Sequence, residues 1–197
     1  MPLLHHDNSI ELNDIIKNCW DELTLAAQSS THPYHFPVLG TNHQNEVELR
    51  TVVLRAVIQN EESLVFYSDF RSPKINQIQE NPQVSWLFYN GESRIQIRIK
   101  GLAKIHHQDE ISHQYWKLLK SRNKRDYATI LSPSSTIKNN KEVDYIKDGN
   151  DEQLFDHFVG VTTEVTEIDW LKIGSDSNKR ARFLKEKSGF MGEWLVP

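Results

Sequence analysis

Two arginines bracket a short apolar stretch, "RTVVLR", at residues 50–55. Alternation along a strand would give each face one arginine and two uncharged neighbours: Arg50, Val52 and Leu54 on one face, and Thr51, Val53 and Arg55 on the other. A guanidinium is a planar fork of donors that can hold a phosphate through two hydrogen bonds. The same pattern fits arginines whose stems lie along a sheet while their charged ends reach solvent. The residues alone leave both interpretations open.

A second group of polar side chains lies in "VFYSDFRSPK", where a predicted strand ends and a short predicted helix begins. Ser72 suits the N-cap and Pro73 the first helical position. The side chains gathered around this helix start are Tyr67, Ser68, Arg71, Ser72 and Lys74. First-turn N–H groups and the helix dipole favour an anion at such a position. An ordinary capped helix with a solvated lysine remains the alternative.

The run "SRIQIRIKG" alternates isoleucines with the polar residues Arg94, Gln96, Arg98 and Lys100. One face therefore belongs to a core and the other offers hydrogen-bonding groups. Gln96 could bond the edge of a planar heterocycle. A solvated polar face is the commoner explanation of such a pattern.

The remaining chain indicates how these segments are held. Apolar residues at helical spacing predict a helix over residues 10–29, and short β-rich runs follow, separated by Gly, Asn, Asp and Pro. "DEISHQYWKLLKSR" again has the helical period, and residues 130–155 form a polar stretch that we expect to be a partly mobile surface loop. Strand-like runs, "HFVGVTTEVTEIDWLKI" and "ARFLKEK", close the chain. We predict a mainly β fold with flanking helices, a small β-barrel in one domain spanning residues 1–197.

Composition narrows the function. A net charge of −4 argues against a general nucleic-acid binder. The only cysteine, Cys19, excludes an internal disulfide and favours a reducing compartment, and without a signal peptide or a long apolar stretch we expect a cytoplasmic protein that does not enter a membrane. The nine histidines lack paired metal-binding spacing, so we expect no metal site.

The order of five segments resembles one family of flavoproteins. "RTVVLR", "FYSDFRSPKINQIQENPQVSWLFY", "RIQIRIKG", "LSPSS" and "IDWLKIGSDSNKR", with a final "EWLVP", resemble the pyridoxamine 5'-phosphate oxidase-like proteins over about residues 10–197. The opening helix followed by "THPYHFPVLGT" resembles the uncharacterised, oxidase-related branch of that family. The resemblance implies a split β-barrel that binds FMN between the two subunits of a homodimer.

The resemblance also implies which residues contact the cofactor. Arg50 and Lys74 match residues that bind the FMN phosphate, while Pro73 stands where the family usually has an Arg and Arg71 is near enough to replace it. Gln96 matches a residue that bonds the flavin ring. The full set that we expect at the cofactor is Arg50, Thr51, Val52, Val53, Leu54, Arg55, Tyr67, Ser68, Arg71, Ser72, Lys74, Gln96, Ser134, Ser135, Trp170 and Arg180. Within it, Ser134 and Ser135 would act across the dimer interface, and Trp170 and Arg180 would complete the flavin site.

The substrate positions depart from the family pattern. Asp176 and Asn178 stand where the family has a substrate-binding Arg and His, and the segment before "LSPSS" lacks the Tyr-x3-Arg-Pro spacing. An Asp at the first position would repel a substrate phosphate. We therefore expect an FMN-dependent oxidoreductase acting on an unidentified small molecule. The alternatives are a pyridoxamine/pyridoxine 5'-phosphate oxidase that produces pyridoxal 5'-phosphate and hydrogen peroxide, a non-catalytic flavin or haem binder, and an interaction protein with an empty barrel.

Overall fold

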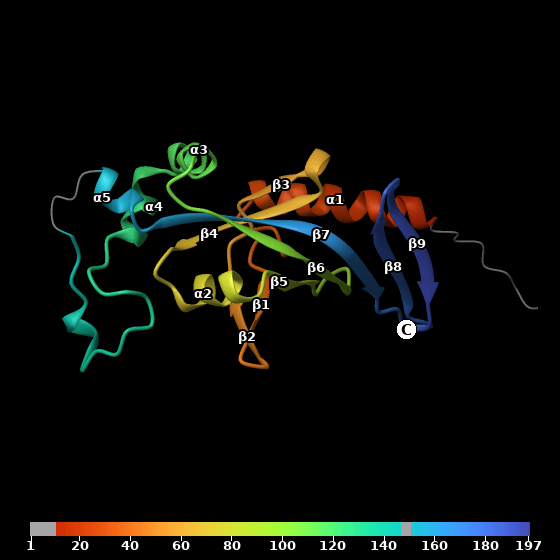
Figure 1. The fold of residues 1–197 in the computed structure, drawn as a ribbon. Coiled ribbons are helices and arrows are strands. Elements are labelled where there is room, and N and C mark those ends of the chain that lie inside the picture. The colour runs from red at the N-terminus through yellow and green to blue at the C-terminus, as the bar shows by residue number, and fades with distance from the viewer. Residues whose placement is uncertain (1–10, 147–150) are drawn as a thin grey trace, which may run out of the picture.

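The computed structural model describes residues 11–146 and 151–197 of the chain. One antiparallel sheet dominates them, and helices flank it (Figure 1). The strands of the sheet are β1 (Val38–His43), β2 (Glu46–Thr51), β3 (Ala56–Ile58), β4 (Ser63–Asp69), β5 (Gln83–Asn90), β6 (Ile95–His106), β7 (Phe158–Lys172), β8 (Lys179–Glu186) and β9 (Gly189–Leu195). The helices are α1 (Leu12–Gln28), α2 (Pro73–Glu80), α3 (Glu110–Leu118), α4 (Ser121–Lys124) and α5 (Asp151–Phe155). The predicted class, mainly β with flanking helices, is confirmed.

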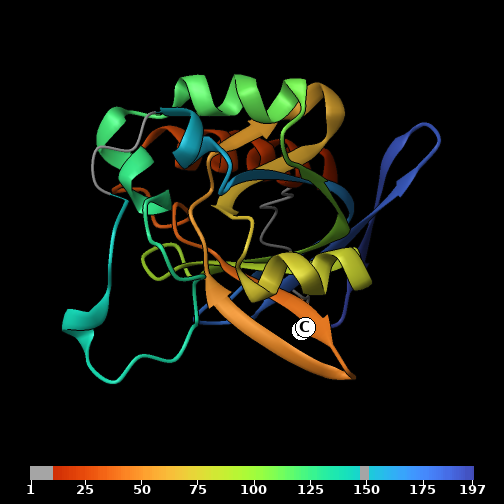
Figure 2. The ribbon, with the colours of Figure 1, turned by 60° about the vertical axis from the view of Figure 1, so that its left-hand side comes forward.

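The sheet curves into a barrel with an open seam (Figure 2). Its strand order is β2-β1-β5-β6-β7-β4-β3, with β8 beside β7 and β9 beside β8. The end strands β2 and β3 do not pair with each other, and residues 52–55 connect them across the seam. The N–H of Val52 donates to the carbonyl of Pro37 at 3.0 Å, and the N–H of Arg55 donates to the carbonyl of Val65 at 2.8 Å. This crossing segment ties both sides of the split barrel together.

The crossing segment corrects the prediction of a single strand through "RTVVLR". β2 ends at Thr51 and β3 begins at Ala56. Val52 and Leu54 still share one side, as alternation predicts, and both are buried in the core. The chain leaves the strand here because backbone bonds to Pro37 and Val65, which lie on different sides of the seam, replace a regular ladder.

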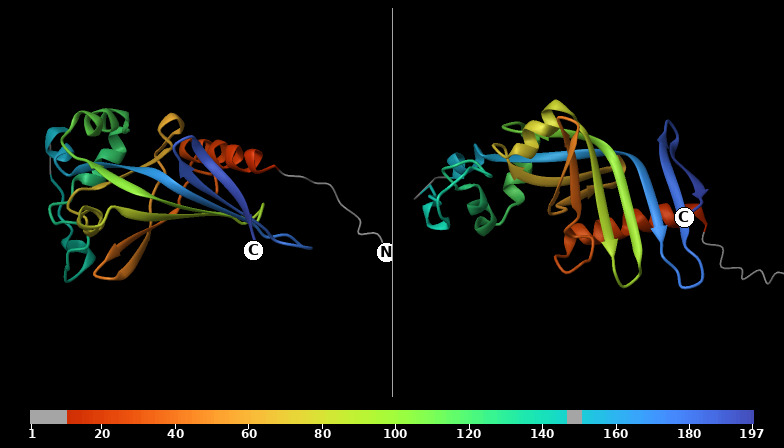
Figure 3. Two further views of the ribbon diagram at one scale, coloured as in Figure 1. Left: turned by 45° about the vertical axis from the view of Figure 1, so that its right-hand side comes forward. Right: turned by 90° about the horizontal axis from the view of Figure 1, so that it is seen from below.

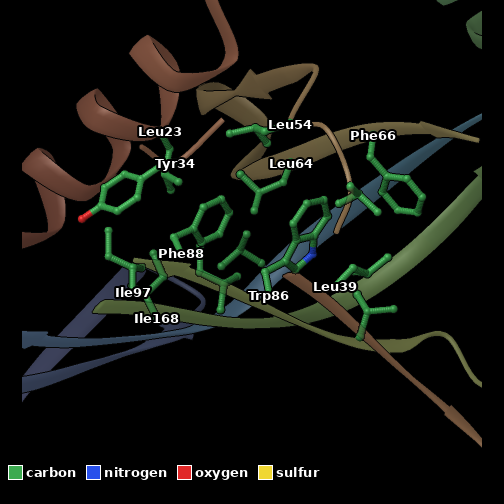
Figure 4. Packing of buried hydrophobic residues seen from close by; sticks show 14 of the residues in the cluster. Leu23, Tyr34, Leu39, Leu54, Leu64, Phe66, Trp86, Phe88, Ile97 and Ile168 are labelled. Carbon is green, nitrogen blue, oxygen red and sulfur yellow. The ribbon is translucent and has the colours of Figure 1, made fainter. Parts of the chain in front are cut away.

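The barrel core follows from the alternating strands. In β5, Val84, Trp86 and Phe88 are buried while their neighbours face outward, and β6 continues the pattern with Ile97 and Ile99. Figure 4 shows Trp86 and Phe88 packed among apolar side chains from the opposite strands. α1 covers the core with residues at helical spacing: Ile15, Cys19, Leu23 and Ala26.

A smaller aromatic cluster lies at the other end of the molecule, where α3, α4 and α5 gather (Figure 1). Phe155 of α5 is buried there, with its ring 5.7 Å from that of Trp116 and 6.2 Å from that of Phe158. The prediction of a loop over residues 130–155 is therefore wrong for residues 151–155, because the apolar Leu154 and Phe155 pack onto this cluster. Residues 147–150 of that prediction, and residue 10 of the predicted first helix, lie outside the described residues.

Strand β9 was not predicted. It forms a hairpin with β8 at one side of the molecule (Figure 3). Its residues are exposed or half-buried, so the strand lacks the buried apolar alternation that reveals the others. Gly192 allows the hairpin to lie close to β8, because a Cβ there would sit 2.6 Å from the ring of Phe183. Across residues 11–146 and 151–197, no helix has the length and apolar character needed to cross a membrane.

Candidate functional site

A cationic group lies where β2 and β4 meet the start of α2. Its members are Arg50, Ser68, Ser72 and Lys74, and we call it the α2 cluster. Two sequence segments contribute to it: "RTVVLR" supplies Arg50, and "VFYSDFRSPK" supplies the other three residues. Its geometry decides whether it can hold an anion.

Arg50 is held in place from two sides. Its Nη1 donates to Thr41 Oγ1 at 2.5 Å and its Nη2 donates to Gln77 Oε1 at 3.1 Å. Both partners are buried, since Thr41 is 1% exposed and Gln77 is 3% exposed. Burial lowers the pKa of Arg50, and the half-exposed Glu48 carboxylate, 3.2 Å from Nη2, partly offsets this. The guanidinium is thus fixed in direction and partly desolvated.

Lys74 projects from the first turn of α2 toward the same place. Its ammonium donates to Ser72 Oγ at 2.6 Å and to Ser68 Oγ at 3.1 Å. Burial lowers the pKa of Lys74, and the neighbouring charge of Arg50 lowers it further, while Asp69 partly opposes the shift. Within the described residues, Lys74 has no carboxylate partner in an ion pair. Two cations therefore lie together with little compensating negative charge.

The start of α2 adds uncharged donors. Ser72 is the N-cap and Pro73 opens the helix, as predicted, but the Ser72 side chain makes no cap hydrogen bond. Its oxygen accepts from Lys74 instead. The N-terminal N–H groups of a helix lack intrahelical partners and carry a partial positive charge. Together with the two cations, they suit a doubly charged phosphate.

Arg71 has a different role from the one expected. Its Nε and Nη2 bind the two carboxylate oxygens of Asp69 at 3.0 and 2.6 Å. The same guanidinium donates to the carbonyls of Thr129 and Ile130. The guanidinium of Arg71 is therefore occupied by a buried carboxylate. It also ties residues 129–130 to the end of β4. The prediction that Arg71 replaces the missing phosphate-binding Arg is not supported by this geometry.

Arg55 and Tyr67 form a second group, beneath α3. The guanidinium carbon of Arg55 lies 5.7 Å from the centre of the Tyr67 ring. Arg55 Nε is buried and has no hydrogen-bond partner among the residues that the structure describes. Burial raises the pKa of Tyr67 to about 12, so its phenol is protonated and can donate. Tyr67 and Ser68 alternate along β4, so Tyr67 faces this group while Ser68 faces the α2 cluster.

A third group lies on the outer face of the sheet. Gln96, Leu171 and Arg180 are direct cross-strand neighbours, so their side chains share this face. Beside them, Asp169 accepts from Arg98 at 2.7 Å and from Arg180 at 2.8 Å. Burial alone would raise the pKa of Asp169, but the hydrogen bonds and charges of Arg180 and Arg98 hold it below its ordinary value. The Arg180 charge is therefore balanced by a buried carboxylate.

Trp170 does not join Arg180. It pairs with Ile97 and Ala181 in the register of the sheet and points into the core, where it is 6% exposed. Adjacent residues of a strand face opposite sides, so the cross-strand register separates the two members of the W-x9-R pair. Trp170 and Arg180 of one chain thus face opposite sides of the sheet, and their part in completing a flavin site stays a prediction.

The other expected residues lie apart from the α2 cluster. Ser134 and Ser135 are exposed on the loop after Ile130, and Ser134 has a left-handed backbone with φ of 71°. Thr51 is exposed at the end of β2, and Val53 is half-buried in the crossing segment. Asn178 closes the β7–β8 turn by accepting from the N–H of Gly174 at 3.3 Å.

The outer face also carries a groove of about 530 Å³, lined by β1, β2, β5, β6 and β7. Arg98 and Asp169 lie in its wall. Its lining includes four large apolar side chains in exposed positions: Val47, Leu49, Leu87 and Leu102. Exposed apolar patches of this kind mark surfaces that bind a partner or a ligand.

Thr41, Gln77 and Asp169 were not predicted from the sequence. The first two are ordinary polar residues whose role in orienting Arg50 depends on strand pairing and on where α2 packs. Asp169 gave a usable signal, because it is a charged residue inside the apolar run "EIDWLKI". No group of three or more His, Cys, Asp or Glu residues that could hold a metal occurs in the part of the chain that the structure describes.

Comparisons with known proteins agree with the fold. Residues 17–107 match the family described as pyridoxamine 5'-phosphate oxidase, FMN-binding domain. A pyridoxine/pyridoxamine 5'-phosphate oxidase of Pelagibacter ubique is 25% identical over 94% of this chain and 96% of its own length. The enzyme of the same name from Acinetobacter baylyi is 32% identical over 59% of this chain, and the match spans 52% of that relative, about half its length.

Two solved structures share the fold. A pyridoxamine 5'-phosphate oxidase-related, FMN-binding protein of Nostoc punctiforme has a TM-score of 0.73 and 18% identity, over 92% of this chain and 97% of that one. PhzG of Burkholderia lata, solved in complex with tetrahydrophenazine-1-carboxylic acid, has a TM-score of 0.68 and 17% identity, over 100% of this chain and 98% of that one.

The fold and the family match define a split-barrel domain of the FMN-binding class. Residues 17–107, a little under half of the chain, match that family's FMN-binding domain, and the Pelagibacter ubique enzyme is similar to nearly the whole chain. The resemblance predicted from the order of its segments is confirmed.

Proposed function

We propose that this protein is an FMN-dependent oxidoreductase whose α2 cluster holds the FMN phosphate. The observation that carries the proposal is the pair Arg50 and Lys74, two partly desolvated cations with little opposing charge. Such a pair is costly in the free protein and becomes favourable when an anion neutralises it. Ser72 and the start of α2 supply further donors. FMN, when bound, would supply the hydride and electron transfer chemistry.

The chain's own residues would position the cofactor. Thr41 and Gln77 orient the Arg50 guanidinium, and the serine oxygens orient the Lys74 ammonium. Preorganised donors of this kind bind an anion without the cost of ordering themselves first. Arg55, with its unpartnered Nε over the Tyr67 ring, would present positive charge to the flavin or to its substrate.

The placement of the third group supports a homodimer. Gln96 and Arg180 lie on the outer face of the sheet, whereas Arg50 bonds Thr41 and Gln77 on the α2 side. One flavin can contact both sets if a second copy of the chain supplies Gln96 and Arg180. The outer groove and its exposed apolar side chains give that copy a surface to cover.

The substrate in this proposal is a small molecule other than pyridoxamine 5'-phosphate. The relatives named above are oxidases of that substrate, but here Asn178 serves the β7–β8 turn and Asp176 is exposed beside it. Neither residue can bind a phosphate as a cation would. We further propose one domain over residues 1–197 and a cytoplasmic location, because a chain whose single cysteine is Cys19 forms no internal disulfide.

The first test is titration of the purified protein with FMN, followed by flavin fluorescence. We expect saturable binding, and Arg50→Ala and Lys74→Ala should each weaken it by roughly 1.5–3 kcal/mol, because each removes a charged hydrogen bond. Lys187→Ala is the matched control, since Lys187 is exposed in the β8–β9 turn. Unchanged affinity in both site variants would reject the assignment. With pyridoxamine 5'-phosphate and oxygen, we expect no hydrogen peroxide above the background of free FMN.

A mixing experiment tests the shared site. One variant combines Arg50→Ala with Lys74→Ala, and the other combines Gln96→Ala with Arg180→Gln. Each alone should bind FMN weakly. Unfolding and refolding them together should restore tight binding at roughly one site in four, because half of the dimers are mixed and each mixed dimer has one intact site. No restoration in mixed dimers would show that the two groups do not meet across an interface.

A further inference from the structure

A separate cavity of about 260 Å³ lies between α1 and the end of the sheet where β5 turns into β6. We call it the α1 cavity. Its lining includes no residue of the α2 cluster, the Arg55 and Tyr67 group or the crossing segment. It is close to the lower end of the size range for small-molecule pockets, about 300–1,000 Å³, so its ligand must be small.

The floor of the α1 cavity is apolar and partly aromatic. Ile15 and Cys19 of α1, Ile97 of β6 and Trp170 of β7 are buried there, with Tyr34 beside them. Burial raises the pKa of Cys19 to about 12 and also raises that of Tyr34, so both groups are neutral at physiological pH. A floor of this kind suits a flat apolar body.

Hydrogen-bond donors without partners line the rim. Lys172 is half-buried, and its side-chain ammonium makes no hydrogen bond or ion pair to any described residue. In the floor, the indole N–H of Trp170 likewise has no hydrogen-bond partner among these residues. The oxygen of Asn90 accepts from the N–H groups of Glu92 and Ser93, which leaves its amide NH2 available. Asn18, Glu22 and Ser93 also line the cavity and supply acceptor oxygens, and Lys172 is the one cationic donor among the described residues of the lining.

The acidic residue in the lining is already engaged. Glu22 Oε2 lies 3.4 Å from Nε2 of His32, which is two residues before Tyr34. A second negative charge on a ligand would meet the repulsion of this carboxylate, whereas a single carboxylate can be matched by Lys172. The rim therefore selects one negative charge.

We propose that the α1 cavity is a second binding site, for a small monocarboxylic acid with a flat apolar body. The carboxylate lies at Lys172 and Asn90, and the body lies over Trp170 and Ile97. The site is separate from the proposed FMN phosphate site, because Arg50 and Lys74 lie on other elements and do not line it.

The test is calorimetric titration of the full chain with benzoate, benzamide and benzylamine. Benzoate should bind with one site per chain, and the neutral and cationic analogues should bind at least about tenfold more weakly because they lose the charged hydrogen bond. Equal binding of all three would overturn the carboxylate assignment. No heat or displacement with benzoate at millimolar concentration would overturn the site itself.

Two variants locate the binding. Lys172→Met keeps the apolar stem and removes the charge, so the affinity for benzoate should fall by at least about tenfold. Lys187→Met, in the β8–β9 turn, is the control and should leave benzoate affinity unchanged. Ser93→Trp should block the cavity mouth and abolish the titration, while the far-ultraviolet circular dichroism reports that the fold is kept. Normal benzoate binding in Lys172→Met and Ser93→Trp would place the ligand elsewhere.

Competition separates this site from the proposed flavin site. Protein saturated with FMN should bind benzoate with unchanged affinity. Displacement of benzoate by FMN would mean that the cavity belongs to the flavin site, and the inference would fail. If FMN does not bind at all, the benzoate titration still decides the inference by itself.

Discussion

Two pairs of cations lie on opposite sides of the same sheet and differ in one respect. Arg98 and Arg180 share the buried carboxylate of Asp169, so their charges are balanced within the chain. Arg50 has the half-exposed Glu48 beside it, and the carboxylate that influences Lys74 is that of Asp69, which binds Arg71. The difference separates cations that stabilise the strands from cations that remain available for an anion. Counting basic residues in the sequence would not distinguish the two pairs.

The largest effect should come from removing both cations of the α2 cluster. We expect Arg50→Ala combined with Lys74→Ala to weaken FMN binding by about 3–5 kcal/mol, roughly 10²–10⁴-fold. The loss should be smaller than the sum of the single losses, because each cation lowers the stability of the other's charge. Titration of the two single variants and the double variant measures this coupling. Strict additivity would show that the cations do not share one anion.

Breaking the balanced pair should affect stability. Asp169→Asn is expected to lower the free energy of unfolding by roughly 1.5–3 kcal/mol, since it weakens charged hydrogen bonds to two partly exposed arginines. Urea unfolding at pH 7 measures the loss, and Glu167→Gln, which removes a more exposed ion pair with Lys100, should cost less than about 1 kcal/mol.

The stability lost in Asp169→Asn should depend on pH. The folded-state pKa of Asp169 is lowered, so its stabilisation is present above its ordinary value of about 3.9 and is lost as the pH falls through the folded pKa. The stability difference between the wild type and Asp169→Asn should therefore be constant near neutrality and shrink in acid. A difference that does not change with acidification would reject Asp169 as the source.

We expect the smallest effect from Lys74→Met, which tests whether the Lys74 charge is unbalanced in the protein without FMN. Lys74→Met removes an unbalanced, desolvated cation, so we expect the protein without FMN to gain about 0.5–1 kcal/mol in unfolding free energy. Because the folded pKa of Lys74 is lowered, protonation penalises the wild type below that pKa, and this penalty disappears as the pH rises toward about 10.4. The gain should therefore shrink at alkaline pH. A loss of stability at pH 7 would show that Lys74 is already balanced.

The strand content and the α2 cluster could be predicted because their signals are local. Alternation along β5 and β6 and the Ser72-Pro73 start of α2 are properties of neighbouring residues. The resemblance to a family then joined Arg50 and Lys74, which no local pattern connects.

What could not be predicted depends on register and closure. By contrast, the opposite directions of Tyr67 and Ser68 could be predicted, because adjacent residues of a strand face opposite sides. The separation of Trp170 from Arg180 depends on which residues of β7 and β8 are paired. The break at residues 52–55 depends on the seam of the barrel, which is formed by segments before β1 and in β4.

The position of β7 has a consequence for the order of folding. This strand pairs with β4, β6 and β8, and its pairing with β4 joins residues nearly a hundred positions apart. The segment matched by the family, residues 17–107, ends before β7 begins. On a growing chain, β4 and β6 therefore remain without their common neighbour until residue 172 has been made. Such long-range pairing folds slowly, on a timescale of about milliseconds to seconds, and leaves two strand edges open to other chains in the meantime.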